Sequence, residues 1–241
     1  MNYQQIREKF RDLSGHHELV NKDGSDNGAG FFINEGRKYL DRVADVQKSH
    51  AQFFKILEVG RYSVSIPSCR AIKEVWIANA TNGRWQLIKK NLQDLVAGYL
   101  ANLPSERMEG TPLYYSPCIT RYIPENADIS ELGAFLGYVE VPAGNAHEYN
   151  SILLNVPVQY QSMIDVRGKF YSHELSGDED TNYWSSQHPM LLYMAAMRQL
   201  EVVNRNSQGV NDWTAAIDSE MKQLEFDLVD ELISEVDQMK G

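Results

Sequence analysis

The sequence has little cysteine, no long hydrophobic run and no excess of positive charge. Its 241 residues include two cysteines, Cys69 and Cys118, which lie far apart and form no CxxC pair. A zinc ribbon is therefore excluded, and reduced, buried thiols are the expected state of both. No segment approaches the length of a membrane span, and the N-terminal MNYQQIREKF has no apolar core of a signal peptide. These absences predict a protein that is made in the cytoplasm and acts there or in a soluble assembly.

The charge balance argues against a protein that wraps nucleic acid. The formal net charge is -10, whereas binding through phosphates requires a concentrated basic surface. A passage that DNA crosses without being gripped remains compatible with this charge. With 43% hydrophobic and 23% charged residues, the chain has the composition of an ordinary globular protein, long enough for one large domain or two small ones.

Motifs of common enzymes are missing as well. The chain contains no GxxxxGK[ST], GxGxxG, HExxH or GxSxG motif. The six histidines show no metal-ligand spacing; they occupy positions 16, 17, 50, 147, 173 and 188. We expect His16 and His17 to lie in a surface turn and His50 to be a partly buried side chain. The sequence therefore predicts no catalytic residue, no cofactor site and no metal site.

Two acidic segments are candidate metal sites. In NKDGSDNGAG, residues 21–30, Asp23 to Gly28 fit the first half of an EF-hand loop, but Asn34 stands where the bidentate Glu is needed. We expect a connecting turn before a helix. In GDEDT, Asp178, Glu179 and Asp180 could serve metal binding or acid/base chemistry. Adjacent residues in a turn point in different directions, and negative charge stabilises a helix N-terminus, so a structural role is favoured.

The first part of the chain has helical periodicity. Tyr3, Ile6, Phe10 and Leu13 repeat at helical spacing, and a second apolar stripe runs from Phe32 to Leu57. We expect this second helix to continue to residue 57 and to be buried along one face.

The middle of the chain, residues 59–172, is typical of strands and turns. An Asn-Gly turn between AIKEVWIAN and RWQLIKK predicts a hairpin. NLQDLVAGYLANL is the helical exception, ending before Pro104, and ENADISELGAFLG is expected to be a loop or brief helix. Further strands are expected in PLYYSPCITRYI, GYVEV, SILLNV and SMIDVRGKFYS, making a small antiparallel sheet or sandwich. Arg84, Lys89 and Lys90, with Trp85 for stacking, could touch nucleic acid, but a solvated hairpin face is favoured.

The last part of the chain returns to helix. Pro189 suits the first turn of a helix whose apolar stripe includes Leu192, Ala196, Leu200 and Val203. Gly209 is expected to end this helix, and a terminal helix follows. The predicted fold is α+β, a helical bundle built from N- and C-terminal helices with an inserted antiparallel β-rich domain. The predicted N-terminal helical part covers residues 1–57, the inserted β-rich domain 58–176 and the C-terminal helical part, with its portal-docking tail, 177–241.

The terminal segment is strongly acidic. Between Asp218 and Gly241 there are eight acidic residues and two lysines, which leave a net charge of -6. One interpretation is a helix packed on its own domain with a solvated acidic face. The other is an amphipathic helix that docks on another subunit through its apolar stripe.

An ordered set of segments carries a family resemblance over nearly the whole chain. They are REKFRDLSG, FFINEGRKYLDR, YSVSIPSCRAIKEVW, GRWQL, VRGKFYS, DEDTNYWSSQHPMLLYMAAMRQLEVVNRN, GVNDW and the closing FDLV and QMKG. Together they resemble the head-to-tail adaptor (connector, neck) proteins of tailed bacteriophages. The resemblance implies a structural, non-enzymatic virion protein with a ring assembly below the portal, which extends the DNA channel and forms the platform for tail attachment.

The resemblance also implies partners. These are portal protein, tail or nozzle proteins and further copies of the chain in a ring, expected to be twelvefold; genomic DNA passes without sequence-specific binding, and no membrane is involved. The place of action is the head-tail neck of the virion, after synthesis in the host bacterial cytoplasm. Since adaptor C-termini commonly reach into portal clefts, the expected portal contacts are Phe226, Leu228, Leu232, Val236 and Met239. The alternatives are a tail-tube or tail-terminator subunit and a metal-dependent hydrolase using Asp178, Asp180 and His188.

Overall fold

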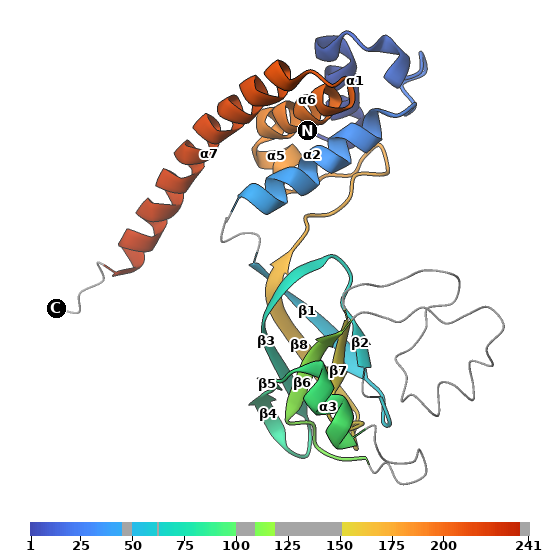
Figure 1. Ribbon diagram of the computed structural model, residues 1–241, viewed down its shortest axis with the longest axis vertical. Coiled ribbons are helices and arrows are strands. Elements are labelled where there is room, and N and C mark those ends of the chain that lie inside the picture. The colour runs from blue at the N-terminus through green and yellow to red at the C-terminus, as the bar shows by residue number, and fades with distance from the viewer. Residues whose placement is uncertain (45–49, 62, 100–108, 119–150, 237–241) are drawn as a thin grey trace. The chain divides into compact units, whose positions relative to one another are not determined.

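The protein has a mixed α+β fold, as expected, with helices and two largely antiparallel sheets (Figure 1). The computed structural model describes residues 1–44, 50–61, 63–99, 109–118 and 151–236. The chain divides into two compact units. Residues 1–49 and 171–241 form one, here called the helical unit, and residues 50–170 form the other, here called the β unit. None of the described helices combines the length and apolar character needed to cross a membrane.

The helical unit takes its helices from both ends of the chain. From the first segment come α1 (Tyr3–Ser14), the short 3-10 helix η1 (His17–Leu19) and α2 (Ala29–Val43). From the second come α5 (Tyr183–Gln187), α6 (Pro189–Val203) and α7 (Ser207–Val236). α1 begins with a capping box between Asn2 and Gln5 and ends at Gly15, whose φ of 73° suits a glycine at a helix C-terminus. Pro189 lies in the first turn of α6, as predicted.

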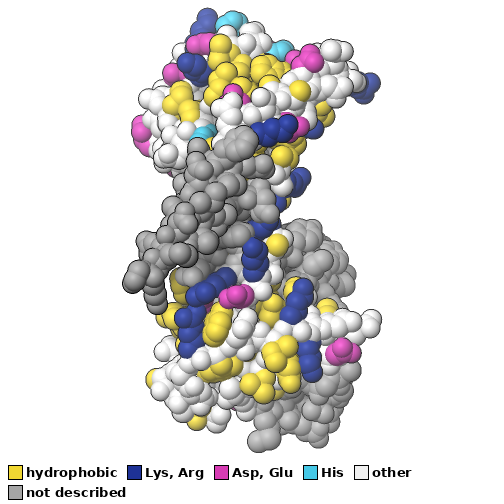
Figure 2. Space-filling view, turned by 90° about the vertical axis from the view of Figure 1, so that its left-hand side faces the viewer, with side chains coloured by type: hydrophobic (Ala, Val, Ile, Leu, Met, Phe, Trp, Pro, Cys, Tyr) yellow, Lys and Arg dark blue, Asp and Glu magenta, His cyan; other side chains and the backbone are white. Residues whose placement is uncertain are grey.

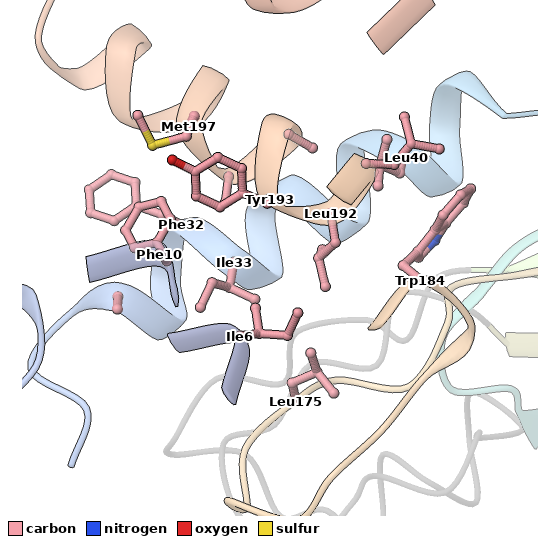
Figure 3. Packing of buried hydrophobic residues seen from close by; sticks show 14 of the residues in the cluster. Ile6, Phe10, Phe32, Ile33, Leu40, Leu175, Trp184, Leu192, Tyr193 and Met197 are labelled. Atoms are coloured by element: carbon pink, nitrogen blue, oxygen red, sulfur yellow. The ribbon is translucent and has the colours of Figure 1, made fainter. Parts of the chain in front are cut away.

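The core of the helical unit lies where α1, α2 and α6 meet (Figure 3). α2 and α6 approach so closely at Gly36 that an added Cβ would lie 2.6 Å from the backbone nitrogen of Ala196. Figure 3 shows Phe10, Phe32 and Tyr193 grouped at one end of this core. The two apolar stripes of the sequence therefore cover each other, which confirms the partnership expected between them.

The β unit contains two four-stranded sheets. The first has the order β1-β8-β3-β4, with β1 at His50–Leu57, β8 at Ser162–Phe170, β3 at Cys69–Asn79 and β4 at Gly83–Gln86. The second has the order β2-β7-β6-β5, with β2 at Ser63–Ser65, β7 at Ser151–Leu154, β6 at Tyr114–Cys118 and β5 at Ile88–Lys89. Neighbours are antiparallel except β5 and β6, and helix α3 (Leu92–Tyr99) precedes β6.

Both sheets contribute to one core. Ile77 and Ile164 of the first sheet and Ile152 of the second are fully buried in the same cluster. The predicted hairpin is confirmed, since β3 and β4 pair around Asn79 and Gly83. The sulfhydryl of Cys69 is free and buried here, and this burial raises its pKa above 9.0.

The prediction that the second helix continues to Leu57 is wrong. α2 ends at Val43, and His50–Leu57 forms strand β1, paired along its whole length with β8. The stripe misled because Phe53 and Leu57 fit a helical spacing of four and also share one face of a strand. Phe54 and Ile56 are exposed apolar residues on the other face, so the alternation typical of a strand is absent. The units therefore divide at residues 49/50 and 170/171, where the sequence predicted 57/58 and 176/177.

The expected break at Gly209 is also wrong. Helix α6 ends at Val203, Arg205 adopts a φ of 57°, and α7 begins at Ser207, so Gly209 lies inside its first turn. The backbone N–H groups of residues 204–206 donate hydrogen bonds to carbonyl oxygens in the last turn of α6, so this helix ends without a glycine. The segments GYVEV and ENADISELGAFLG lie outside the described residues.

Candidate interaction surfaces

The acidic turn at 177–181 forms an ion pair and a hydrogen bond with residues at the start of the chain, and so holds α1 on the rest of the helical unit. Asp178 Oδ1 lies 2.8 Å from Arg7 Nη2, and Glu179 Oε2 accepts a 3.0 Å hydrogen bond from the side chain of Asn2. Asp180 Oδ2 accepts from the backbone N–H groups of Gly177 (2.7 Å) and Ser176 (2.9 Å). These hydrogen bonds, that of Gly177 foremost, lower the pKa of Asp180 below 3.8.

The three carboxylates thus have three different partners. His188, the third residue of the hydrolase alternative, lies 3.2 Å from the Tyr183 hydroxyl through its Nε2. Within the described ranges, no group of three His, Cys, Asp or Glu side chains is placed to hold a metal ion. His16 likewise pairs through Nδ1 with Glu18, at 2.7 Å. The turn therefore has a structural role, holding α1 through Arg7 and Asn2, and its side chains do not converge on a common point.

A buried polar network, which the sequence analysis missed, ties the segment after β8 to α2. Asp41 accepts hydrogen bonds from Trp184 Nε1 (2.7 Å) and from both the backbone nitrogen and hydroxyl of Ser172 (2.9 Å each). Arg37, one turn earlier on α2, donates to the carbonyl oxygen of Ser172, and burial lowers its pKa. Charged residues four apart within the apolar stripe of α2 were the signal that could have revealed this network.

The terminal helix α7 packs on the helical unit through its first half. Ile217 and Met221 are buried in the core, and Trp213 and Leu224 pack against it, at spacings of three and four. The backbone stays helical from there to Val236, and Figure 1 shows α7 continuing past the end of α6. Four of the predicted portal contacts, Phe226, Leu228, Leu232 and Val236, lie on this second half, whereas position 239 is outside the described residues.

The basic residues in and after β4 and β5, two consecutive strands of different sheets, do not form one nucleic-acid surface. Arg84 binds Asp165, with Nη2 2.7 Å from Oδ2, and the Lys90 ammonium lies 3.9 Å from the centre of the Tyr114 ring. Trp85 is half-buried against the β core and donates its indole N–H to the carbonyl oxygen of Pro112. Arg84 instead covers Trp76, at 4.8 Å from the ring centroid. Arg84, Lys89 and Lys90 are all exposed, so the solvated-face interpretation fits these three residues.

The outward side of the first sheet is the other exposed surface with a distinct character. We define the outer sheet face by Phe54, Ile56, Trp76, Arg84, Met163 and Arg167. Cross-strand pairing aligns Ile56 with Met163, and Phe54 with Asp165, which in turn pairs with Trp76. Figure 2 shows hydrophobic side chains interspersed with Lys and Arg on a face of the β unit, with few acidic ones between them.

A scan of protein-family models finds no match to this chain, and a search of curated proteins finds none either.

Proposed function

We propose that the protein is a structural virion component, the head-to-tail adaptor of a tailed bacteriophage. In this proposal a ring of copies lies below the portal, extends the DNA channel and provides the surface to which the tail attaches. The helical unit is the bundle of each subunit, and the β unit is the inserted domain that faces tail or nozzle proteins. Catalysis plays no part in this role.

The observation that carries the proposal is the length of α7, whose backbone stays helical well past the residues described in the core. Leu224 packs on the helical unit and is the last residue of α7 whose side chain the structure describes, and the helix backbone runs a further 12 residues to Val236. At 1.5 Å per residue this is about 18 Å of helix. A helix of this kind, with leucine and valine at spacings of four and carboxylates between them, suits a groove on a partner. We assign that groove to the portal.

The charge of the chain fits a conduit for DNA. Residues 1–49 contain eight basic and eight acidic residues, whereas residues 171–241 contain four basic and 14 acidic ones. The whole net charge of -10 therefore belongs to the second segment of the helical unit. An acidic wall repels phosphates, so DNA that passes along it is not retained.

The test is to remove the distal half of α7 without touching its packed half. A chain that ends at Leu224 keeps Ile217, Met221 and Leu224 in the core, so we expect it to fold. It should lose co-purification with portal protein from infected cells, and full retention of portal binding would contradict the proposal. Its melting temperature gives the control for folding.

A point variant sharpens this test. Leu232→Glu places a charge on the apolar stripe of α7, and Ser234→Glu places the same charge on the opposite side of the helix. We expect the first variant to weaken portal binding by about tenfold or more, as loss of an apolar anchor does, and the second to leave it unchanged. Equal effects of both variants would contradict docking through the stripe.

A further inference from the structure

The chain enters the β unit and leaves it through one pair of adjacent strands. His50, the first residue of β1, is the cross-strand partner of Lys169, the last residue but one of β8. Directly opposed residues of an antiparallel pair have Cα atoms about 4.5–5.5 Å apart. The two ends of the β unit therefore lie side by side, and the pairing of its own strands holds them there.

The helical unit has a closure of its own, made by polar residues of α2. Asn34, Arg37 and Asp41 follow one another at spacings of three and four, so they lie along one side of the helix. We call these three residues the polar stripe of α2. Residues 171–175, here called the returning segment, follow directly after β8 and bind along this stripe.

Each residue of the polar stripe holds the backbone of the returning segment. Asn34 donates to the carbonyl oxygen of Leu175 at 2.9 Å and accepts from its backbone nitrogen at 3.0 Å. Arg37 donates to the carbonyl oxygen of Ser172, and Asp41 accepts from the backbone nitrogen and the hydroxyl of the same serine. Ser172 thus contacts the last turn of α2 and Leu175 an earlier turn, so the returning segment runs antiparallel to the helix.

Burial strengthens this attachment. Arg37 and Asp41 are each 3% exposed, and hydrogen bonds with charged groups are stronger away from water. Leu175, which is 1% exposed, adds an apolar anchor in the same core as Ile33 (Figure 3). Asp41 precedes Ala44, the C-cap of α2, by less than one helical turn. Within the helical unit, the point where the chain leaves and the point where it returns are therefore adjacent.

The two hydrophobic cores are separate among the described residues. The buried side chains of the helical core come from residues 3–44 and 175–221, and those of the β core come from residues 57–166. No described side chain belongs to both clusters. Contiguous groups of residues that share a core open as one cooperative unit, so two cores favour two units of unfolding.

We infer that the helical unit and the β unit unfold in separate cooperative steps, and that the polar stripe of α2 keeps the helical unit closed when the β unit is unfolded. An unfolded β unit is a loop between residues 44 and 171, and the entropic cost of closing a loop grows only with the logarithm of its length. The hydrogen bonds of the stripe and the burial of Leu175 oppose that cost. This inference goes beyond the proposed function and does not depend on it, because it concerns the purified chain without a partner.

The test is native-state hydrogen exchange of the purified full chain in increasing urea, read by mass spectrometry of peptides from each unit. We expect peptides of β3 and β8 to exchange through one shared opening and those of α2 and α6 through another. Ile33→Val and Ile164→Val are matched variants, because both isoleucines are fully buried, one in each core. Each should accelerate exchange about two- to tenfold in its own unit and leave the other unit unchanged. Equal acceleration of both units by either variant would overturn the inference.

Asn34→Ala tests the polar stripe itself. It removes both hydrogen bonds with Leu175, so exchange in α2 and in the returning segment should rise about tenfold, while β3 and β8 keep their wild-type rates. Asn211→Ala, the same substitution at an exposed position of α7, is the control and should not accelerate exchange. Wild-type exchange of the returning segment in Asn34→Ala, or equal acceleration of the β unit, would contradict closure by the stripe.

Discussion

Asp41 is the residue whose loss we expect to destabilise the helical unit most. Its carboxylate is buried and accepts hydrogen bonds from Trp184 and Ser172. Asp41→Ala would leave these donors unsatisfied, so we expect the free energy of unfolding to fall by about 2–4 kcal/mol. Urea unfolding followed by circular dichroism measures this change. Asp12→Ala, at an exposed ion pair with Arg11, should change stability by at most about 0.5 kcal/mol, and equal losses would contradict a role for the network.

Buried tyrosines predict a loss of stability in alkali. Burial raises the pKa of Tyr3, Tyr183 and Tyr193 above 10.0 in the helical unit. A phenol whose pKa is higher in the folded than in the unfolded chain stabilises the fold in its neutral form. That stabilisation is complete below pH 10 and is lost as the pH rises through the folded pKa.

Urea unfolding at successive pH values above 9 checks this expectation. The free energy of unfolding should decrease as the pH passes 10. Tyr193→Phe keeps the ring beside Phe10 and Trp213 and removes one ionisable group, so its decrease should be shallower. A stability that stays flat across this range would contradict the prediction.

At the scale of elements, the contact between α2 and α6 depends on Gly36. A methyl group at this position would lie 2.6 Å from Ala196 N and 2.8 Å from the carbonyl carbon of Ala195, so the helices would have to separate. Gly36→Ala should therefore lower the free energy of unfolding by about 1–3 kcal/mol, despite the better helix propensity of alanine.

Gly110→Ala is the control for the substitution itself. The nearest atom to its added Cβ would be Val156 Cγ2 at 3.5 Å, an ordinary contact. Its effect on the free energy of unfolding should stay below about 1 kcal/mol. A harmless Gly36→Ala would show that the two helices tolerate a wider separation.

Helices and the hairpin were predictable from sequence where local signals agree. The capped start of α1, Pro189 in α6 and the Asn-Gly turn all specify their elements through neighbouring residues. Strand β1 was not predictable, because its pairing with β8 joins residues more than 100 positions apart and its outward face is apolar. The break between α6 and α7 likewise depends on the backbone of Arg205, which has no signature in sequence.

The candidate surfaces were predictable only in part. The distal half of α7 was expected from charge and periodicity. The outer sheet face was missed, because recognising it requires the register that sets Phe54, Asp165 and Trp76 in one row. The hairpin alternation also separates Arg84 from Trp85, so that Arg84 stacks on Trp76 and Trp85 turns toward the core.

At the scale of the whole molecule, charge and surface are divided between the two units. The net charge of -10 lies in residues 171–241, whereas residues 50–170 carry 11 basic and 11 acidic residues and are neutral overall.

The adaptor role is tested most directly by purifying the tagged chain from infected cells. Its partners are identified by mass spectrometry, and the eluate is imaged by negative-stain microscopy. We predict ring-shaped particles that contain portal subunits, and their absence when the chain ends at Leu224. A portal-free monomer or dimer, recovered from a lysate rich in assembled heads, would contradict the adaptor role.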